Sequence, residues 1–254
     1  MVLRIILWLF MVGVIIAAYL APPARQFQVE DAARIIFFHV PAAISCVVFF
    51  VVGAFYAWRF LRRKQEMDDV KSLAAIEMGT LMCVLATITG SIFALIQWGS
   101  AWHWDPRETS IVAQLLIYAA YFALRASVQD ARRRASLAAG YALFAIVTVP
   151  FLIFVAPRYW ASLHPENTLV SSAGLDPIYR TVLWSSFAGY ITIGLLIMRL
   201  RVRAGELMSR LESAYGLETG GHAPATHRLV GADGIPVLGG EARQPSREGD
   251  EAVT

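Results

Sequence analysis

The chain has 254 residues, of which 57% are hydrophobic and only 16% are charged. Soluble globular domains carry about a quarter charged residues, so this composition argues against a soluble fold and indicates that lipid surrounds much of the chain. The formal net charge of +3 is too small to suggest a nucleic-acid partner, and we expect none.

Six apolar segments reach the roughly 20 residues that a helix needs to cross about 30 Å of hydrocarbon. They cover residues 3–21, 35–58, 73–98, 110–128, 136–156 and 181–200. The first could be mistaken for a signal peptide, but Ala21-Pro22-Pro23 is a poor cleavage context, so we predict a retained helix. The sequence therefore predicts an all-α membrane protein with six transmembrane helices.

Lys and Arg residues are distributed unevenly among the loops that join these segments. They are concentrated in residues 59–71 and 125–134 and after the last span, in residues 199–203. Cytoplasmic loops carry the excess of Lys and Arg, so both termini are predicted to be cytoplasmic. The loops predicted to lie outside are 22–34, 99–109 and 157–180.

The chain changes character after Tyr215, where Gly, Pro, Ala and charged residues replace the apolar segments. Such a composition buries too little apolar surface to offset the entropy of ordering. We predict two parts: a transmembrane domain of residues 1–205, and a cytoplasmic C-terminal segment of residues 206–254 that is largely disordered.

Three of the five histidines fall on the predicted outer side: His39, His103 and His164. His39 precedes Arg59 by about 20 residues, which as helix span the full hydrocarbon thickness and place His39 at the outer boundary. His164 lies in the outer loop 157–180. A single interfacial histidine often only caps a helix, but two from different segments suit the axial positions of a heme iron.

The outer loop between the third and fourth spans has the sequence Trp98-Gly99-Ser100-Ala101-Trp102-His103-Trp104-Asp105. Tryptophan is common at membrane interfaces, but three within seven residues exceed that tendency. Aromatic faces suit a flat apolar ligand, and glycine allows its close approach. Arg107 can bind a carboxylate or can pair with Asp105 or Glu108.

The segment from Trp98 to Ser110 resembles the WWD signature of heme-handling proteins of cytochrome c maturation, and Thr87-Ile88-Thr89-Gly90-Ser91 is similar to the lead-in to that loop. Within this superfamily, the six-span size, the motif Phe38-His39-Val40-Pro41 and the motif Trp160-Ala161-Ser162-Leu163-His164-Pro165 resemble the CcmC family of system I. The resemblance covers residues 1–205, with the WWD loop at 98–110.

The resemblance implies a protein that binds heme b as transient cargo at the outer face of the bacterial inner membrane and delivers it to the heme chaperone CcmE. It implies His39 and His164 as axial ligands of the iron. The loop residues expected to hold heme are Trp98, Gly99, Trp102, Trp104, Asp105 and Arg107. His103 lies within the signature, and we expect it to hydrogen-bond a propionate rather than to ligate iron.

The same family implies the partners CcmA, CcmB and CcmD in an ABC transporter complex. The chain has no Gly-x-x-x-x-Gly-Lys-Ser/Thr loop, so ATP hydrolysis is expected only in a partner, and the chain itself is not expected to be an enzyme. Cys46 and Cys83 lack the Cys-x-x-Cys spacing of a metal or dithiol site.

Two alternatives fit parts of the pattern. A membrane electron-transfer cytochrome with two histidine ligands would place both histidines deep within facing helices. A permease or channel would line a path with ionisable residues. Glu77, Gln97 and Gln114 do not form such a path in the sequence.

Overall fold

The computed structural model describes residues 2–24, 27–164 and 176–215. Its helices, in chain order, are α1 (Val2–Leu20), η1 (Glu30–Ile35), α2 (Ile36–Arg63), α3 (Glu66–Trp98), α4 (Pro106–Ser127), α5 (Ala131–Pro150), η2 (Phe151–Val155), η3 (Ala156–Arg158) and α6 (Pro177–Tyr215). No strand occurs among these residues. The predicted all-α class is therefore confirmed.

Five helical segments within the described residues are long and apolar enough to cross a membrane, and they correspond to the second to sixth predicted spans. The predicted N-terminal span corresponds to α1, which counts as a shorter apolar helix over Ile5–Leu20. The chain is thus a multi-pass membrane protein. The sixth crossing and the location of the termini stay predictions.

The helix boundaries differ from the predicted spans because polar turns extend the helices beyond the apolar segments. α3 begins at Glu66 rather than at residue 73, with three acidic side chains in its first turn, where the helix dipole favours negative charge. α6 continues to Tyr215, well past the predicted end near residue 200. Residues 206–215 of the predicted C-terminal segment are therefore helical, and the part from residue 216 onward, where disorder is expected, lies outside the described residues.

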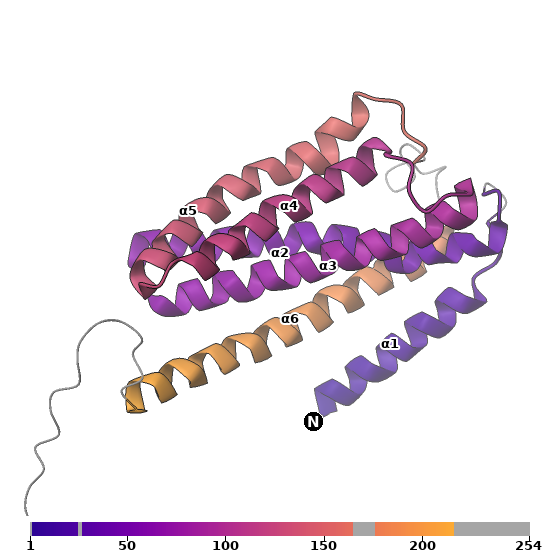
Figure 1. The fold of residues 1–254 in the computed structure, drawn as a ribbon. Coiled ribbons are helices and arrows are strands. Elements are labelled where there is room, and N and C mark those ends of the chain that lie inside the picture. Colours follow the sequence, from indigo (N-terminus) through magenta and orange to yellow (C-terminus); the bar gives the residue numbers. More distant parts are fainter. Residues whose placement is uncertain (1, 25–26, 165–175, 216–254) are drawn as a thin grey trace, which may run out of the picture. The chain divides into compact units, whose positions relative to one another are not determined.

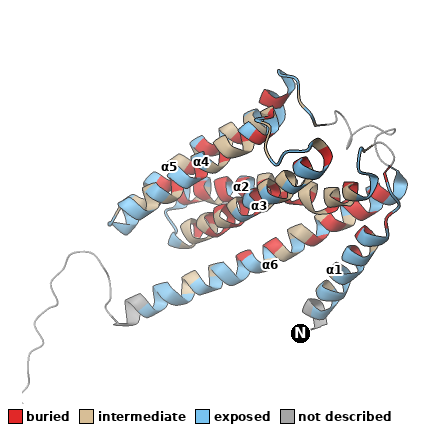
Figure 2. Ribbon diagram, turned by 45° about the vertical axis from the view of Figure 1, so that its right-hand side comes forward, coloured by how far each residue is buried: buried red, intermediate tan, exposed pale blue. Residues whose placement is uncertain are grey.

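The antiparallel pair α2 and α3 forms the centre of the helical unit of residues 1–218 (Figure 1). α4 and α5 pack on one side of this pair, α6 packs on the other side, and α1 contacts α6. Buried residues gather where the central helices face each other, whereas the outward faces carry exposed apolar side chains, as expected for lipid contact (Figure 2).

Glycines allow the close approach of α2 and α3. A Cβ at Gly79 would come within 2.6 Å of the Phe50 ring, and a Cβ at Gly53 within 2.6 Å of the Ile76 side chain. Small residues at such positions let helix backbones approach in a membrane, where packing replaces the hydrophobic effect as the main source of association. These two contacts therefore fix the register of α2 against α3.

Ion pairs join α3 to its neighbours near the end of the bundle opposite the Trp-rich loop. Arg125 of α4 binds Asp69 through two hydrogen bonds of 2.7 and 2.9 Å. Arg59 of α2 lies 3.2 Å from the carboxylate of Asp68, which is almost fully buried. These pairs neutralise carboxylates in a part of the molecule where an unpaired charge is costly.

Candidate functional site

The Trp-rich loop is held by the ends of the two helices that it joins. Gly99 ends α3 with φ +80°, and its N–H donates to the carbonyl of Leu95. This left-handed conformation is unfavourable for residues other than glycine. Trp104 adopts φ +54°, which is uncommon for a bulky residue.

Asp105 begins α4 as its N-cap, with Pro106 in the first helical position. The Asp105 carboxylate accepts the N–H of Arg107 at 2.9 Å, and the Glu108 carboxylate accepts the N–H groups of His103 and Asp105 at 2.8 and 3.2 Å. This arrangement is a capping box with proline at N1. The helix thus starts at residue 106, inside the loop predicted to span residues 98–110.

Asp105 also anchors the segment that carries His164. Its carboxylate accepts hydrogen bonds from the Ser162 hydroxyl at 2.9 Å, the Leu163 N–H at 2.7 Å and the His164 Nδ1–H at 3.0 Å. The Asp105 side chain is only 1% exposed. A single buried carboxylate therefore joins two segments that are 57 to 59 residues apart.

The protonation states of this pair follow from burial and hydrogen bonding. Burial raises the pKa of Asp105, but the N–H groups of Arg107 and Leu163 outweigh burial and hold that pKa below its usual value. Burial lowers the pKa of His164 to about 4, despite the opposing charge of Asp105. At neutral pH, a neutral imidazole therefore donates Nδ1–H to an ionised carboxylate, and Nε2 keeps its lone pair.

His39 lies in the first turns of α2, and its Nδ1 is 3.0 Å from the carbonyl oxygen of Ala86 and 3.3 Å from the hydroxyl of Thr89 on α3. A carbonyl oxygen can only accept, so Nδ1 carries the proton and Nε2 has the free lone pair. In both candidate ligands, the hydrogen bond at Nδ1 fixes the tautomer that ligates metals through Nε2.

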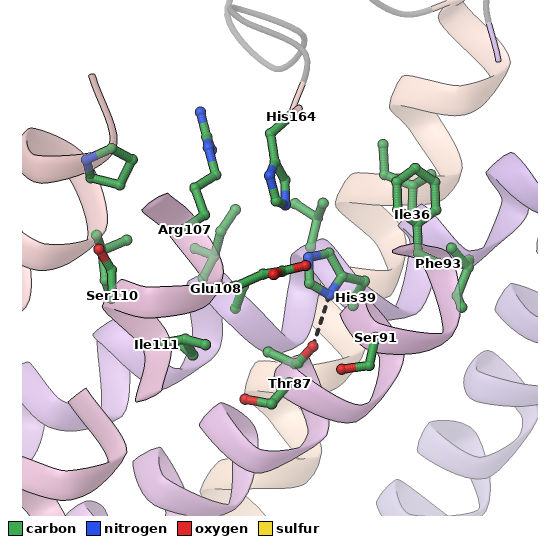
Figure 3. A pocket seen from close by; sticks show the side chains of 18 of the residues that line it. Ile36, His39, Thr87, Ser91, Phe93, Arg107, Glu108, Ser110, Ile111 and His164 are labelled. Carbon is green, nitrogen blue, oxygen red and sulfur yellow. Dashed lines mark hydrogen bonds between the residues drawn. The ribbon is translucent and has the colours of Figure 1, made fainter. Parts of the chain in front are cut away.

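A mainly apolar cavity of about 280 Å³ lies between these two histidines and the surrounding helices. Figure 3 shows His164 entering it from the loop and His39 from α2, with Arg107 beside His164. Its polar lining consists of the two imidazoles, Arg107, Glu108 and three hydroxyl side chains. Apolar residues of α2, α3, α4 and η2 complete the walls, in the manner of a small-molecule site with few polar groups.

One wall contains η2, a π-helical turn that directly follows Pro150. Proline has no N–H to continue the α-helical pattern, and π turns are common next to functional sites. Leu152, Ile153 and Phe154 of this turn line the cavity.

The predicted loop residues occupy different positions around this cavity. Trp98 and Trp102 line it together with Arg107, whereas Gly99, Trp104 and Asp105 are not among its lining residues within the described chain. Gly99 ends the helix and Asp105 lies behind His164. Trp104 is 72% exposed and contacts Trp102 edge to face, with ring centroids 5.8 Å apart.

Trp98 contacts two histidines. Its ring meets the ring of His164 at 5.1 Å and that of His103 at 5.8 Å, both edge to face. His103 does not line the cavity, and its buried Nδ1 has no hydrogen-bond partner within the described residues. Arg107 forms no ion pair with Asp105 or Glu108 in the described part of the chain, so its guanidinium is available to a ligand.

Three features of the site did not emerge from the sequence. Glu108 lines the cavity while it caps α4, and the motif Asp105-Pro106-Arg107-Glu108 contained the signal for that cap. The Gln97 side chain hydrogen-bonds both backbone groups of Val29 at 2.8 and 3.2 Å, which joins the segment between α1 and α2 to α3. The η2 turn lies in the segment 136–156, which apolar length alone predicts to be a regular helix.

The chain is similar to known proteins over nearly all of its described length. The family model CcmC, heme exporter protein C, matches residues 1–215. Heme exporter protein C of Escherichia coli strain K12 is 31% identical over 179 residues, which are 70% of this chain and 72% of that protein. Heme exporter protein C of Paracoccus denitrificans is 28% identical over 197 residues, covering 76% and 81%. A putative cytochrome c biosynthesis ccmC-like mitochondrial protein of Arabidopsis thaliana is 25% identical over 232 residues, covering 90% and 83%.

Proposed function

Since the chain belongs to the heme exporter protein C family and so has a role in heme handling for cytochrome c maturation, we propose that it binds heme b as cargo in the cavity between His39 and His164. The observation that carries the proposal is the pair of imidazoles. They come from different segments, each has its Nδ1 hydrogen-bonded, and both line one apolar cavity. The Nε2 atoms are the groups that would ligate the iron.

The remaining cavity residues suit the rest of a heme molecule. Arg107 lines the cavity, and its guanidinium forms no ion pair with a carboxylate of the described residues, so it suits a propionate. Trp98 and Trp102 offer aromatic surface to the porphyrin, and the aliphatic walls suit its apolar edge. Asp105 acts through His164, because it fixes the orientation of that ring and increases its basicity.

Delivery is the second part of the proposal. Heme leaves the outer face for the heme chaperone CcmE, within a complex that includes CcmA, CcmB and CcmD in the bacterial inner membrane. Two strong axial ligands hold heme firmly, so release requires energy from a partner. We place ATP hydrolysis in those partners and no enzymatic step in this chain.

The ligands are tested by visible spectra of purified wild-type protein and of the variants His39→Ala and His164→Ala in detergent. We expect the wild type to show the low-spin spectrum of two histidine ligands, and each variant to lose that spectrum or much of its heme. His103→Ala is the matched control for iron ligation: it removes a neighbouring imidazole that does not line the cavity and is expected to leave the low-spin spectrum in place. An unchanged spectrum and heme content in both ligand variants would refute the assignment.

Delivery is tested by mixing the heme-loaded protein with the soluble domain of CcmE and separating the two. Transfer of heme to the chaperone domain supports a delivery protein. An electron-transfer cytochrome would retain its heme and would instead exchange electrons with redox partners, and a permease would contain no heme after purification.

A further inference from the structure

Gly90 of α3 lies directly against the imidazole of His39. A Cβ built on Gly90 would be 2.8 Å from Cε1 of His39, 3.2 Å from Nδ1 and 3.8 Å from Nε2. Carbon atoms in favourable contact are about 3.5 to 4.0 Å apart, so even a methyl group would overlap the ring. At position 90, therefore, only the hydrogen atom of glycine leaves enough room for the imidazole of His39.

The backbone of Gly90 does not itself require glycine, because this residue continues a regular helix and has no positive φ. Glycine in the middle of a helix is less favourable than alanine. The contact with His39 accounts for this unfavourable choice, since the three atoms nearest to an added Cβ all belong to the His39 ring.

The same turn of α3 also fixes the rotation of the ring. The carbonyl of Ala86 accepts the Nδ1–H of His39 at 3.0 Å. The Thr89 hydroxyl donates its own proton to the carbonyl of Leu85 at 2.7 Å, so it can only accept toward His39. Both contacts require a proton on Nδ1 and leave Nε2 free on the cavity side.

We propose that Ala86, Thr89 and Gly90 form an imidazole seat, a single helical turn of α3 that sets the tautomer of His39 and the position of its Nε2 in the cavity. This inference rests on the proposed function, because it assigns to these residues the positioning of one heme ligand. Gly90 determines how closely the ring approaches α3, and the two oxygen atoms determine which nitrogen faces the cargo.

The helices α2 and α3 cannot easily move apart to make room for a side chain at position 90. The Phe50 ring packs on Gly79, and the Ile76 side chain packs on Gly53. The two helices therefore contact each other closely at two further glycines along their length. An added methyl group at Gly90 is therefore expected to displace the imidazole rather than the helices, and so to move Nε2 from its position.

The test compares Gly90→Ala with Gly140→Ala. Gly140 is also inside a helix, α5, but a Cβ there would meet nothing within 4 Å. Both variants gain a better helix former, so we expect folding and yield to be unaffected. Hemin titration of the purified apo-protein should show binding on the order of 10-fold to 100-fold weaker for Gly90→Ala, with loss of the low-spin spectrum, and no change for Gly140→Ala.

A double variant shows whether Gly90→Ala weakens hemin binding through the position of His39 or through a general loss of structure. If Gly90 acts through His39, then Gly90→Ala combined with His39→Ala should bind hemin no more weakly than His39→Ala alone. Full additivity of the two losses would overturn the proposal. Thr89→Ser should behave as wild type, because it keeps the hydroxyl, whereas Thr89→Val should weaken binding.

A measurement without heme distinguishes failure of the seat from failure of the proposed function. In the apo-protein with ¹⁵N-labelled histidine, the nitrogen resonances of His39 should report a proton on Nδ1, and Gly90→Ala should change them. If Gly90→Ala changes these resonances while His39→Ala keeps the wild-type heme spectrum, the imidazole seat is supported and the proposed function is refuted. If Gly90→Ala leaves both the resonances and hemin binding unchanged, the seat itself is refuted.

Discussion

Asp105→Asn offers the sharpest test of how the Trp-rich loop and the segment of His164 are held together. The Asp105 carboxylate accepts from four different donors: the N–H groups of Arg107 and Leu163, the Ser162 hydroxyl, and Nδ1–H of His164. Asparagine is about as good an N-cap as aspartate, so the substitution preserves the start of α4. It replaces one acceptor oxygen by an NH₂ group, which can only donate.

The hydrogen bonds of the two carboxylate oxygens determine how much stability Asp105→Asn should lose. The oxygen near Leu163 accepts its N–H at 2.7 Å, and the other oxygen accepts from Arg107 and His164 at 2.9 and 3.0 Å. Either orientation of the amide therefore turns an NH₂ group toward at least one buried N–H donor. An unsatisfied buried donor costs about 1–3 kcal/mol, and we expect a loss of about 2 kcal/mol of unfolding free energy.

Loss of the partner at Nδ1 should also release the orientation of His164, so hemin binding should weaken by about 10-fold to 100-fold. Hemin titration and thermal unfolding in detergent measure the two effects. Asp130→Asn is the matched control: Asp130 is the N-cap of α5, and its side chain accepts from the Arg133 N–H at 2.7 Å. If Asp105→Asn and Asp130→Asn show the same small change in both assays, the anchoring role of Asp105 is wrong.

Three further predictions concern other parts of the molecule. Arg107→Gln should weaken the binding of hemin but not of its dimethyl ester, since only free propionates attract the guanidinium; equal losses for both ligands in parallel titrations would contradict this role. Arg125→Gln should lower the unfolding free energy by about 3 kcal/mol, because it leaves the mostly buried Asp69 carboxylate unpaired, and thermal unfolding measures the loss. Ser100→Cys should react with an impermeant thiol reagent from the outer side and Gln129→Cys only after permeabilisation; the reverse result would invert the predicted topology.

The sequence predicted five of the spans because membrane helices are selected by apolar length, which is a local property. It predicted their ends poorly, because helices continue through polar turns once capped. Asp105-Pro106-Arg107-Glu108 carried a start signal for α4 at residue 106, and the acidic turn at Glu66 carried one for α3. Both signals are independent of hydropathy, so apolar length alone does not predict these helix starts.

The sequence predicted that His39 and His164 lie on one side of the molecule, and both line one cavity, but it did not predict the residues that hold these side chains in place. The positions of His39 and His164 followed from the orientation of the spans together with the motif resemblance. The partners of these histidines lie far away in sequence: Ala86 is 47 residues from His39, and Asp105 is 59 residues from His164. No local pattern reports such contacts, because they arise only when the helices pack.

The two histidines are held in different ways, and this difference bears on release. His39 belongs to a helix, and its ring packs on Gly90 of a neighbouring helix whose register is fixed at other glycines. His164 belongs to a short segment that makes three hydrogen bonds to the Asp105 carboxylate, and bonds to a charged group contribute about 1.5–3 kcal/mol each. Displacing the His164 segment breaks these hydrogen bonds alone at Asp105, whereas displacing His39 would disturb the packing of α2 on α3. A partner that displaces the segment around His164 therefore leaves the helix packing intact, so we expect release of the proposed heme cargo to begin with the loss of His164 while His39 stays in place.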